Sequence, residues 1–100
     1  MEIRFATTDL EELCESEKGA ESYPPEVVEA FFDRISVIDD AVDERDLRAL
    51  KSLHFEKLKG HSNRYSMRLN RQWRLILSFE PPKGPEKAVV VIEISKHYGD

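Results

Sequence analysis

The sequence contains only one cysteine, Cys14, among its 100 residues. A lone cysteine cannot form an intramolecular disulfide, and low cysteine content is typical of reducing compartments, so we expect a cytoplasmic protein. The acidic neighbours of Cys14 should raise the pKa of its thiol, which argues against a thiolate nucleophile. These neighbours are Glu11, Glu12, Glu15 and Glu17.

Long apolar runs and metal-binding spacings are also missing. No stretch approaches the roughly 18 apolar residues that a membrane-spanning helix needs. The first residues, 1–5, lack the basic and then apolar pattern of a signal peptide. His54, His61 and His97 are scattered along the chain, with no second cysteine to join them. We therefore expect no metal site, no cofactor and no membrane partner.

Charged residues are abundant, at 35% of the chain beside 40% hydrophobic residues. This balance predicts a folded globular protein rather than a disordered one. Residues 1–100 have room for a single domain with one modest core. The formal net charge of −5, taken over the whole molecule, argues against a nucleic-acid partner.

The charge is divided unevenly along the chain. Residues 1–50 contain 5 Lys/Arg and 15 Asp/Glu, whereas residues 51–100 contain 10 Lys/Arg and 5 Asp/Glu. Phosphate binding responds to the field within about 8–10 Å, the Debye length in moderate salt. The division therefore admits two faces with two tasks. The plainer alternative is that acidic helices only keep a basic sheet in solution.

The segment from Lys57 to Phe79 contains six basic residues and no acidic ones. Its apolar residues alternate with polar ones in two runs separated by a short polar break, which predicts a β-hairpin. Successive side chains of a strand point to opposite faces, so one face should be apolar and the other should carry Arg68 and Arg74. An ordinary solvated strand face is the alternative interpretation.

The N-terminal half predicts a short strand followed by helices. Ile3 to Phe5 alternates as a strand, and Thr7 to Asp9 can cap a helix that ends by Gly19. Pro25 suits the first turn of the next helix. That helix has the clearest apolar stripe in the chain, formed by Val27, Val28, Phe31, Phe32, Ile35 and Ile38.

The rest of the chain completes an α+β fold. Asp43 can cap a short third helix, with a hydrophobic staple between Val42 and Leu47. Three prolines in residues 80–86 predict a loop, and the apolar run of residues 88–94 predicts a strand inside the sheet. The expected product is a small antiparallel sheet with the N-terminal helices packed on one face.

An ordered set of short motifs runs through the basic segment: Leu58-Lys59-Gly60, Tyr65-Ser66-Met67-Arg68-Leu69-Asn70 and Gln72-Trp73-Arg74-Leu75. This set resembles the signature of the HigB-like branch of the RelE/ParE toxin superfamily, and the order of elements fits from about residue 24 to Tyr98. The resemblance implies a RelE-like fold, similar to that of microbial ribonucleases. It also implies a type II toxin that pairs with a small antitoxin.

RNA can be cut without a metal when its 2′-OH attacks the neighbouring phosphorus. The step needs a base, an acid and cations for the added phosphorane charge. His97 could transfer a proton near neutral pH, and Tyr98 could stack on a base or orient the 2′-OH. The expected catalytic set is Lys59, Arg68, Arg74, His97 and Tyr98, and four flanking residues should bind RNA: His54, Lys57, Arg64 and Arg71.

The C-terminal tail departs from the family pattern. HigB-like nucleases often close with an acidic residue, Tyr and His. Alignment on Tyr98 places His97 at the acidic position and Gly99 at the histidine position. The histidine that often stands three residues before the Leu-Lys-Gly lysine is Glu56 here, with His54 two residues further back. RelE-type relatives work with lysines, arginines and a tyrosine, so a set without a conventional base is admissible.

Three functions are compatible with the resemblance. The first is a toxin that cleaves messenger RNA in the ribosomal A site, and the Leu-Lys-Gly and Gln-Trp-Arg motifs favour it. The second is a ParE-like poison of DNA gyrase, and the third is a non-toxic relative that only binds an antitoxin. The expected antitoxin is a small helix-turn-helix protein, and contact with operator DNA would pass through it.

Overall fold

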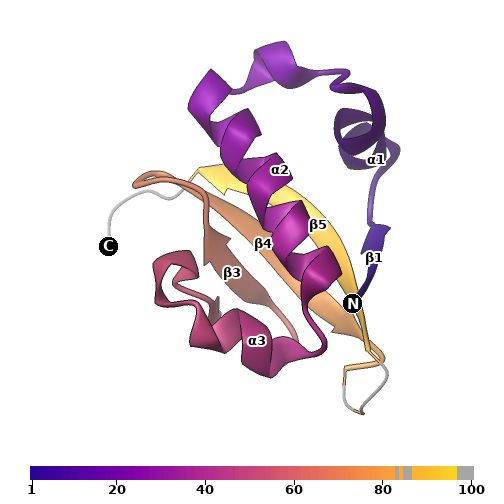
Figure 1. Ribbon diagram of the computed structural model, residues 1–100, viewed down its shortest axis with the longest axis vertical. Helices are drawn as coiled ribbons and strands as arrows, with labels where there is room; N and C mark the ends of the chain where they lie inside the picture. Colours follow the sequence, from indigo (N-terminus) through magenta and orange to yellow (C-terminus); the bar gives the residue numbers. More distant parts are fainter. Residues whose placement is uncertain (83, 85–86, 97–100) are drawn as a thin grey trace.

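The computed structural model describes residues 1–82, 84 and 87–96. A layer of helices lies over one face of a five-stranded sheet (Figure 1), and the predicted α+β class is confirmed. Within the described ranges, no helix is both long enough and apolar enough to cross a membrane. The elements are β1 (Glu2–Phe5), α1 (Thr8–Ser16), η1 (Ala20–Ser22), α2 (Pro25–Asp40), α3 (Glu44–Ala49), η2 (Lys51–Leu53), β2 (Glu56–Lys57), β3 (Tyr65–Arg68), β4 (Trp73–Glu80) and β5 (Ala88–Lys96).

The strand order across the sheet is β1-β5-β4-β3-β2. The predicted meander of β3, β4 and β5 is antiparallel, with β5 inside the sheet as expected. β1 pairs with β5 in parallel, so the sheet is mixed where a wholly antiparallel one was predicted. Parallel neighbours need a long crossover, which the helical layer provides here. The two-residue strand β2 is too short to produce an alternating pattern, and the sequence did not predict it.

Helix α2 provides the main cover of the sheet, as its apolar stripe predicted. Val27, Phe31 and Ile38 have no exposed surface and pack in one cluster with the inner residues of β4 and β5. Burying a side chain such as Phe31 contributes about 1.5–3 kcal/mol. Most of the predicted helical stripe is therefore core, which leaves the chemistry to the other face of the sheet.

Two helix caps follow the sequence, and one predicted contact does not form. The Thr7 side chain accepts a hydrogen bond from Leu10 N at 3.2 Å, and Asp43 Oδ1 accepts one from Arg45 N at 2.9 Å. The predicted staple of Val42 with Leu47 is wrong, because Val42 is 82% exposed. Val42 N instead donates to Asp46 Oδ2 at 2.8 Å, which closes the cap without an apolar contact.

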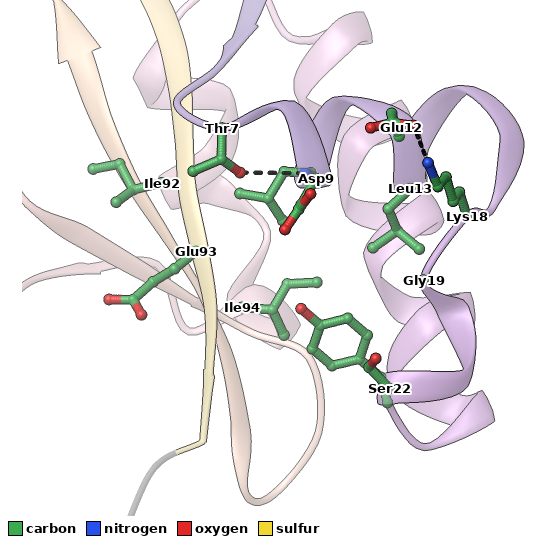
Figure 2. A pocket seen from close by; sticks show the side chains of 12 residues that line it. Thr7, Asp9, Glu12, Leu13, Lys18, Gly19, Ser22, Ile92, Glu93 and Ile94 are labelled. Carbon is green, nitrogen blue, oxygen red and sulfur yellow. Dashed lines mark hydrogen bonds and ion pairs between the residues drawn. The ribbon is translucent and has the colours of Figure 1, made fainter.

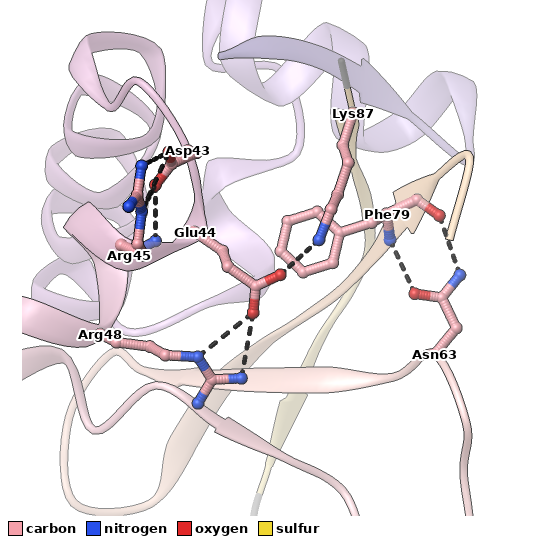
Figure 3. Close-up of polar contacts among 7 residues, drawn as sticks. All are labelled: Asp43, Glu44, Arg45, Arg48, Asn63, Phe79 and Lys87. Atoms are coloured by element: carbon pink, nitrogen blue, oxygen red, sulfur yellow. Dashed lines mark hydrogen bonds and ion pairs between the residues drawn. The ribbon is translucent and has the colours of Figure 1, made fainter. Parts of the chain in front are cut away.

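A polar network joins α3 to one end of the sheet (Figure 3). Glu44 accepts from Lys87 Nζ and, at 3.1 Å, from Arg48 Nη2. The Lys87 ammonium also lies 4.6 Å from the centre of the Phe79 ring. Asn63 donates to Phe79 O at 2.8 Å and accepts from Phe79 N at 3.0 Å. These contacts hold the loop before β3 at the Phe79 end of β4.

Candidate functional site

Two arginines face each other on the outer face of the sheet, which is the face turned away from the helices. Arg68, the last residue of β3, is the cross-strand partner of Arg74 on β4. Like charges placed directly opposite each other destabilise a sheet. Both side chains are half-buried, and their neighbours Ser66 and Ile76 on the same face are only 2% and 9% exposed. This is not the freely solvated strand face of the alternative interpretation.

Part of each guanidinium is enclosed without a partner. Within residues 1–82, 84 and 87–96, Arg68 Nε and Arg74 Nη1 are buried donors with no hydrogen-bond acceptor. No ion pair among these residues involves either arginine. A buried donor without an acceptor costs free energy comparable to a lost hydrogen bond. The pair is therefore electrostatically suited to an incoming anion.

His54 joins the arginine pair from the segment before β2. Its Nε2 lies 3.2 Å from Arg68 Nη1. A guanidinium can only donate, so a hydrogen bond at this distance requires an imidazole that is neutral at Nε2. The backbone of His54 is left-handed, with φ 50°, and His54 N donates to Lys51 O at 3.1 Å. This uncommon conformation for a non-glycine residue aims the ring at Arg68.

The rest of the outer face does not carry the same free positive charge. At its far edge, Arg4 is paired with Glu2 at 2.7 Å and with Glu80 at 3.0 Å. On β5, Ser95 is opposite Arg74, and Glu93 is two pairs further along, opposite Ile76. In the part of the chain that the structure describes, the Arg68–Arg74 corner is therefore the place on this sheet face where two arginines without an ion pair lie directly opposite each other.

Three other predicted residues lie away from this corner. The Leu58-Lys59-Gly60 motif forms a turn closed by His61 N donating to Leu58 O at 3.3 Å, and Gly60 has the positive φ of 81° that favours glycine. Lys59 and Arg64 belong to this loop, at the opposite end of β3 from Arg68. Three residues of strand separate Tyr65 from Arg68, about 10 Å at ~3.3 Å each. Lys59 therefore does not join the two arginines at one point.

The positions of Lys57 and Arg71 also follow from the strand register. Lys57 is paired with Tyr65, whose side chain points to the opposite face from Arg68. Arg71 is exposed in the turn between β3 and β4, next to the arginine pair. The structure thus brings His54 to the pair and Arg71 to its border, and it places Lys57 on another side of the sheet.

The predicted tail residues His97 and Tyr98 lie outside the described residues. Lys96, which precedes them in the chain, is the strand partner of Trp73. The next pair along the ladder joins Ser95 to Arg74. The described part of β5 therefore ends beside the arginine pair.

Sequence reasoning missed Arg34 of α2. Its Nε donates to the main-chain oxygen of Arg68 at 2.9 Å, and its side chain is only 18% exposed. The signal was present, because Arg34 is three residues after Phe31 and four before Ile38 and so falls on the buried stripe. An arginine on such a stripe needs a polar partner, and here the partner is the backbone of the candidate site.

A cavity of about 370 Å³ lies between α1, η1 and β5, and none of the predicted site residues that the structure describes lines it (Figure 2). Its lining includes three acidic side chains, Asp9, Glu12 and Glu93. Its lysine, Lys18, is paired with Glu12 at 3.0 Å. Such a lining repels phosphate, so this cavity is unsuited to RNA.

Cys14 does not favour a thiolate. Burial raises the pKa of its thiol, and the charge of Glu15 raises it further. The sequence predicted the direction of this shift from acidic neighbours alone, whereas the larger cause is burial. The thiol is therefore protonated near neutral pH and is not the nucleophile of the site.

Comparison with known proteins identifies the family. Residues 3–97 match the family model described as the RelE-like toxin of type II toxin–antitoxin system HigB. Toxin HigB-1 of Vibrio cholerae serotype O1 is 32% identical over 80 residues, which cover 79% of this chain and 84% of that protein. The YoeB/ParE toxin from Agrobacterium tumefaciens has the same fold, with a TM-score of 0.59 at 18% identity over 98% of this chain and all of that one. The chain therefore belongs to the HigB family of RelE-like toxins of type II toxin–antitoxin systems.

Proposed function

We propose that this toxin is a metal-independent endoribonuclease that cleaves messenger RNA in the ribosomal A site. One observation carries the proposal: Arg68 Nε and Arg74 Nη1 are enclosed donors that lack an acceptor within the described chain. The non-bridging oxygens of a phosphate group can accept from two guanidinium groups at once. Bound RNA would offset the repulsion between the arginines, and a small rotation of each side chain toward the phosphate would supply acceptors to the enclosed donors.

The proposed reaction is attack of the RNA 2′-OH on the adjacent phosphorus. The bond to the 5′-oxygen of the next nucleotide breaks, which leaves a 2′,3′-cyclic phosphate and a 5′-OH. Negative charge on the phosphoryl oxygens grows toward the phosphorane, so a pre-arranged pair of cations binds the transition state more tightly than the ground state. Arg68 and Arg74 would take this role.

The proton transfers have three candidates. His54 is suited to act as the base, because the hydrogen bond with Arg68 requires a neutral Nε2. His54 Nε2 would exchange Arg68 for the 2′-OH when RNA binds. His97 would donate to the leaving oxygen, and Tyr98 would stack on a base or orient the 2′-OH. Both of these residues follow the strand that ends beside Arg74.

The remaining basic residues would guide the RNA strand. Arg71 borders the arginine pair, so it would contact the phosphate next to the scissile one. Lys59 and Arg64 lie about 10 Å or more along the hairpin, a spacing that fits neighbouring nucleotides rather than the same phosphate. Lys57 lies on another side of the sheet from Arg68 and would not contact the same stretch of RNA. The sequence predicted Lys59 as a catalytic residue. Its place in the loop before β3 favours binding of the RNA strand instead.

Membership of the family implies a cognate antitoxin. We propose a small helix-turn-helix protein, through which the toxin would reach operator DNA. The ParE-like alternative, a gyrase poison, shares the fold of the YoeB/ParE neighbour, and a non-toxic relative that binds only an antitoxin would keep that fold as well. The enclosed donors favour RNA cleavage, because two guanidinium groups in search of acceptors suit the negative charge that grows on the phosphoryl oxygens during the reaction.

The test is induced expression followed by mapping of transcript 5′ ends. Wild-type protein should arrest growth and produce new ends within coding regions. Arg68→Ala and Arg74→Ala should each lower single-turnover cleavage by about 10²–10³ and leave the melting temperature nearly unchanged. Arg45→Ala is the matched control, since Arg45 is 88% exposed and pairs only locally with Asp43.

Three results would reject the proposal. Growth arrest without new RNA ends, but with altered DNA supercoiling, would identify the gyrase poison. A large fall in melting temperature with toxicity intact would show that the arginines stabilise the fold instead. Absence of both growth arrest and RNA cleavage in the wild-type protein would leave the non-toxic relative.

A further inference from the structure

The backbone that carries Arg68 is held by a second arginine. Arg34, on α2, donates from Nε to Arg68 O at 2.9 Å. Arg34 Nη1 also donates to Asp33 Oδ2 at 2.5 Å, a neighbour whose side chain is 61% exposed. The Arg34 side chain is 18% exposed, so this contact competes little with water. A partly buried guanidinium therefore contacts the main chain of the residue that we place on the scissile phosphate.

Arg68 O is available because the strand ladder stops short of it. β2 pairs with β3 only at Glu56 with Ser66 and at Lys57 with Tyr65. The next residue in register with Arg68 would be His54, but its backbone is left-handed and its N–H is committed to Lys51 O. The end of β3 thus has no strand partner on this side. Arg34 supplies the donor that a longer β2 would have supplied.

Helix α2 also holds the turn that follows Arg68. Asn70 Nδ2 donates to Glu26 Oε1 at 3.4 Å, while Asn70 Oδ1 accepts from Gln72 N at 2.9 Å and Trp73 N at 2.8 Å. The turn connects the strand ends that carry Arg68 and Arg74. Helix α2 therefore contacts the hairpin at two places, the end of β3 and the turn that leads to β4.

The arginine pair needs such support. The two cations repel each other across the strands and have enclosed donors without acceptors, so both effects favour fraying of the strand ends before RNA arrives. A pair that frays must be reassembled during the reaction, and the cost of that step is added to the barrier. A hydrogen bond to the backbone at Arg68 opposes fraying without neutralising the guanidinium groups.

We infer that Arg34 is a positioning residue that fixes the end of β3 and so keeps Arg68 and Arg74 assembled for catalysis. Its catalytic consequence rests on the proposed endoribonuclease function, whereas its effect on the arginine pair does not. The substitution Arg34→Met removes every donor and keeps the apolar stem. Arg34→Lys keeps the charge and one donor, and should restore part of the function. Asp33→Asn keeps Arg34 and should behave nearly as the wild type.

The first readout is nuclear magnetic resonance of the free protein. In the wild type, the Arg34 Nε–H should exchange slowly and show scalar coupling across its hydrogen bond to the Arg68 carbonyl carbon. The enclosed Arg68 Nε–H should also give a sharp signal, which Arg34→Met should broaden and Arg34→Lys should partly recover. Absence of the coupling in wild-type protein would overturn the inference without any variant, so a variant that fails to fold does not remove the test.

The second readout is single-turnover cleavage of RNA. Arg34→Met should lower the cleavage rate by about 10–100-fold, the range expected when a catalytic group is misplaced by about 1 Å. RNA affinity should change less than about 3-fold. In the variant Arg68 and Arg74 can still contact phosphate, although they are no longer held in one arrangement. A purely structural role would lower melting temperature and amount of active protein but leave the rate per folded molecule unchanged, and that result would refute the inference. If Arg68→Ala also cleaves normally, the proposed function fails while the resonance test still decides on Arg34.

Discussion

At the scale of single residues, the candidate site is defined by an unfavourable contact that the fold retains. Arg68 and Arg74 are direct cross-strand partners, an arrangement that costs roughly 0.2–1 kcal/mol relative to neutral residues. Nothing in the core requires charge there, because the inner face of the same strands is fully apolar. The cost is offset once an anion binds between the two side chains.

The sequence was informative about the arginines and less so about their partners. Alternation along residues 65–75 was enough to put Arg68 and Arg74 on one face, since the period of a strand is fixed. The approach of His54 depends on its left-handed backbone, for which the residue type gave no local signal. Arg34 was visible on the helical stripe, but its target is set by tertiary packing.

The two tail residues permit a separate test of proton transfer. His97→Gln should lower single-turnover cleavage by about 10², the low end of the usual 10²–10⁴ range, because arginine electrostatics carry most of the rate. Tyr98→Ala should be severe and Tyr98→Phe milder, since base stacking is worth about 1–3 kcal/mol. The measurement is cleavage rate against pH from 6 to 9.

The outcome for His97 separates two mechanisms. Loss of one limb of the pH profile in His97→Gln would show that His97 transfers a proton during cleavage. A wild-type profile would mean that His97 transfers no proton, and another group would then have to protonate the leaving oxygen. His54→Gln should in either case remove the limb that belongs to the base.

At the scale of elements, the fold follows local patterns where they are long and departs from them where pairing is remote. The 16-residue helix α2 and the meander of β3, β4 and β5 were predicted because each presents several turns or alternations. The parallel pairing of β1 with β5 joins residues more than 80 positions apart and has no local signature. The edge strand β2 matters most for the site. Because it begins only at Glu56, Arg68 O has no strand partner and accepts a hydrogen bond from Arg34 instead.

The network around Glu44 gives the fold a dependence on pH. The hydrogen bond from Lys87, followed by that from Arg48, lowers the pKa of Glu44 below its ordinary value. A carboxyl group whose folded pKa is lowered adds stability above its unfolded pKa, near ~4.3, and loses it as pH falls through the folded pKa. Glu44→Gln should therefore cost about 1 kcal/mol at pH 7 and less at pH 3, where protonation has begun to remove the charge of the wild-type side chain.

Denaturant unfolding at both pH values checks this expectation. Glu29→Gln, an exposed change on α2, is the matched control and should have little effect at either pH. An equal loss for Glu44→Gln at pH 7 and pH 3 would mean that the side chain acts by packing rather than by its charge. Because Arg68 and Arg74 lie at the other end of the sheet, cleavage per folded molecule should not change.

At the scale of the whole molecule, a net charge of −5 is compatible with binding a polyanion. The outer face is not uniformly basic, since Arg4 is neutralised by Glu2 and Glu80. Two cations without an ion pair among the described residues lie opposite each other at the Arg68–Arg74 corner, while acidic side chains line the cavity beside α1. A polyanion responds to the field within about 8–10 Å, so we expect the corner to determine where RNA would bind.

The same division of charge predicts how the cognate antitoxin neutralises the toxin. An acidic segment that covers the Arg68–Arg74 corner would supply acceptors to the enclosed donors and exclude RNA in one step.

The double change Arg68→Ala with Arg74→Ala should weaken antitoxin binding and flatten the dependence of its Kd on salt concentration, because both cations are removed. The measurement is Kd by titration calorimetry at about 50 and 300 mM salt, with crosslinking to map the contact. Arg45→Ala again serves as the control, being exposed and locally paired. If crosslinks map only to residues 9–40 and the residues from Lys59 to Arg74 gain no protection, the antitoxin docks on the acidic helices, and inhibition must then act without covering the arginines.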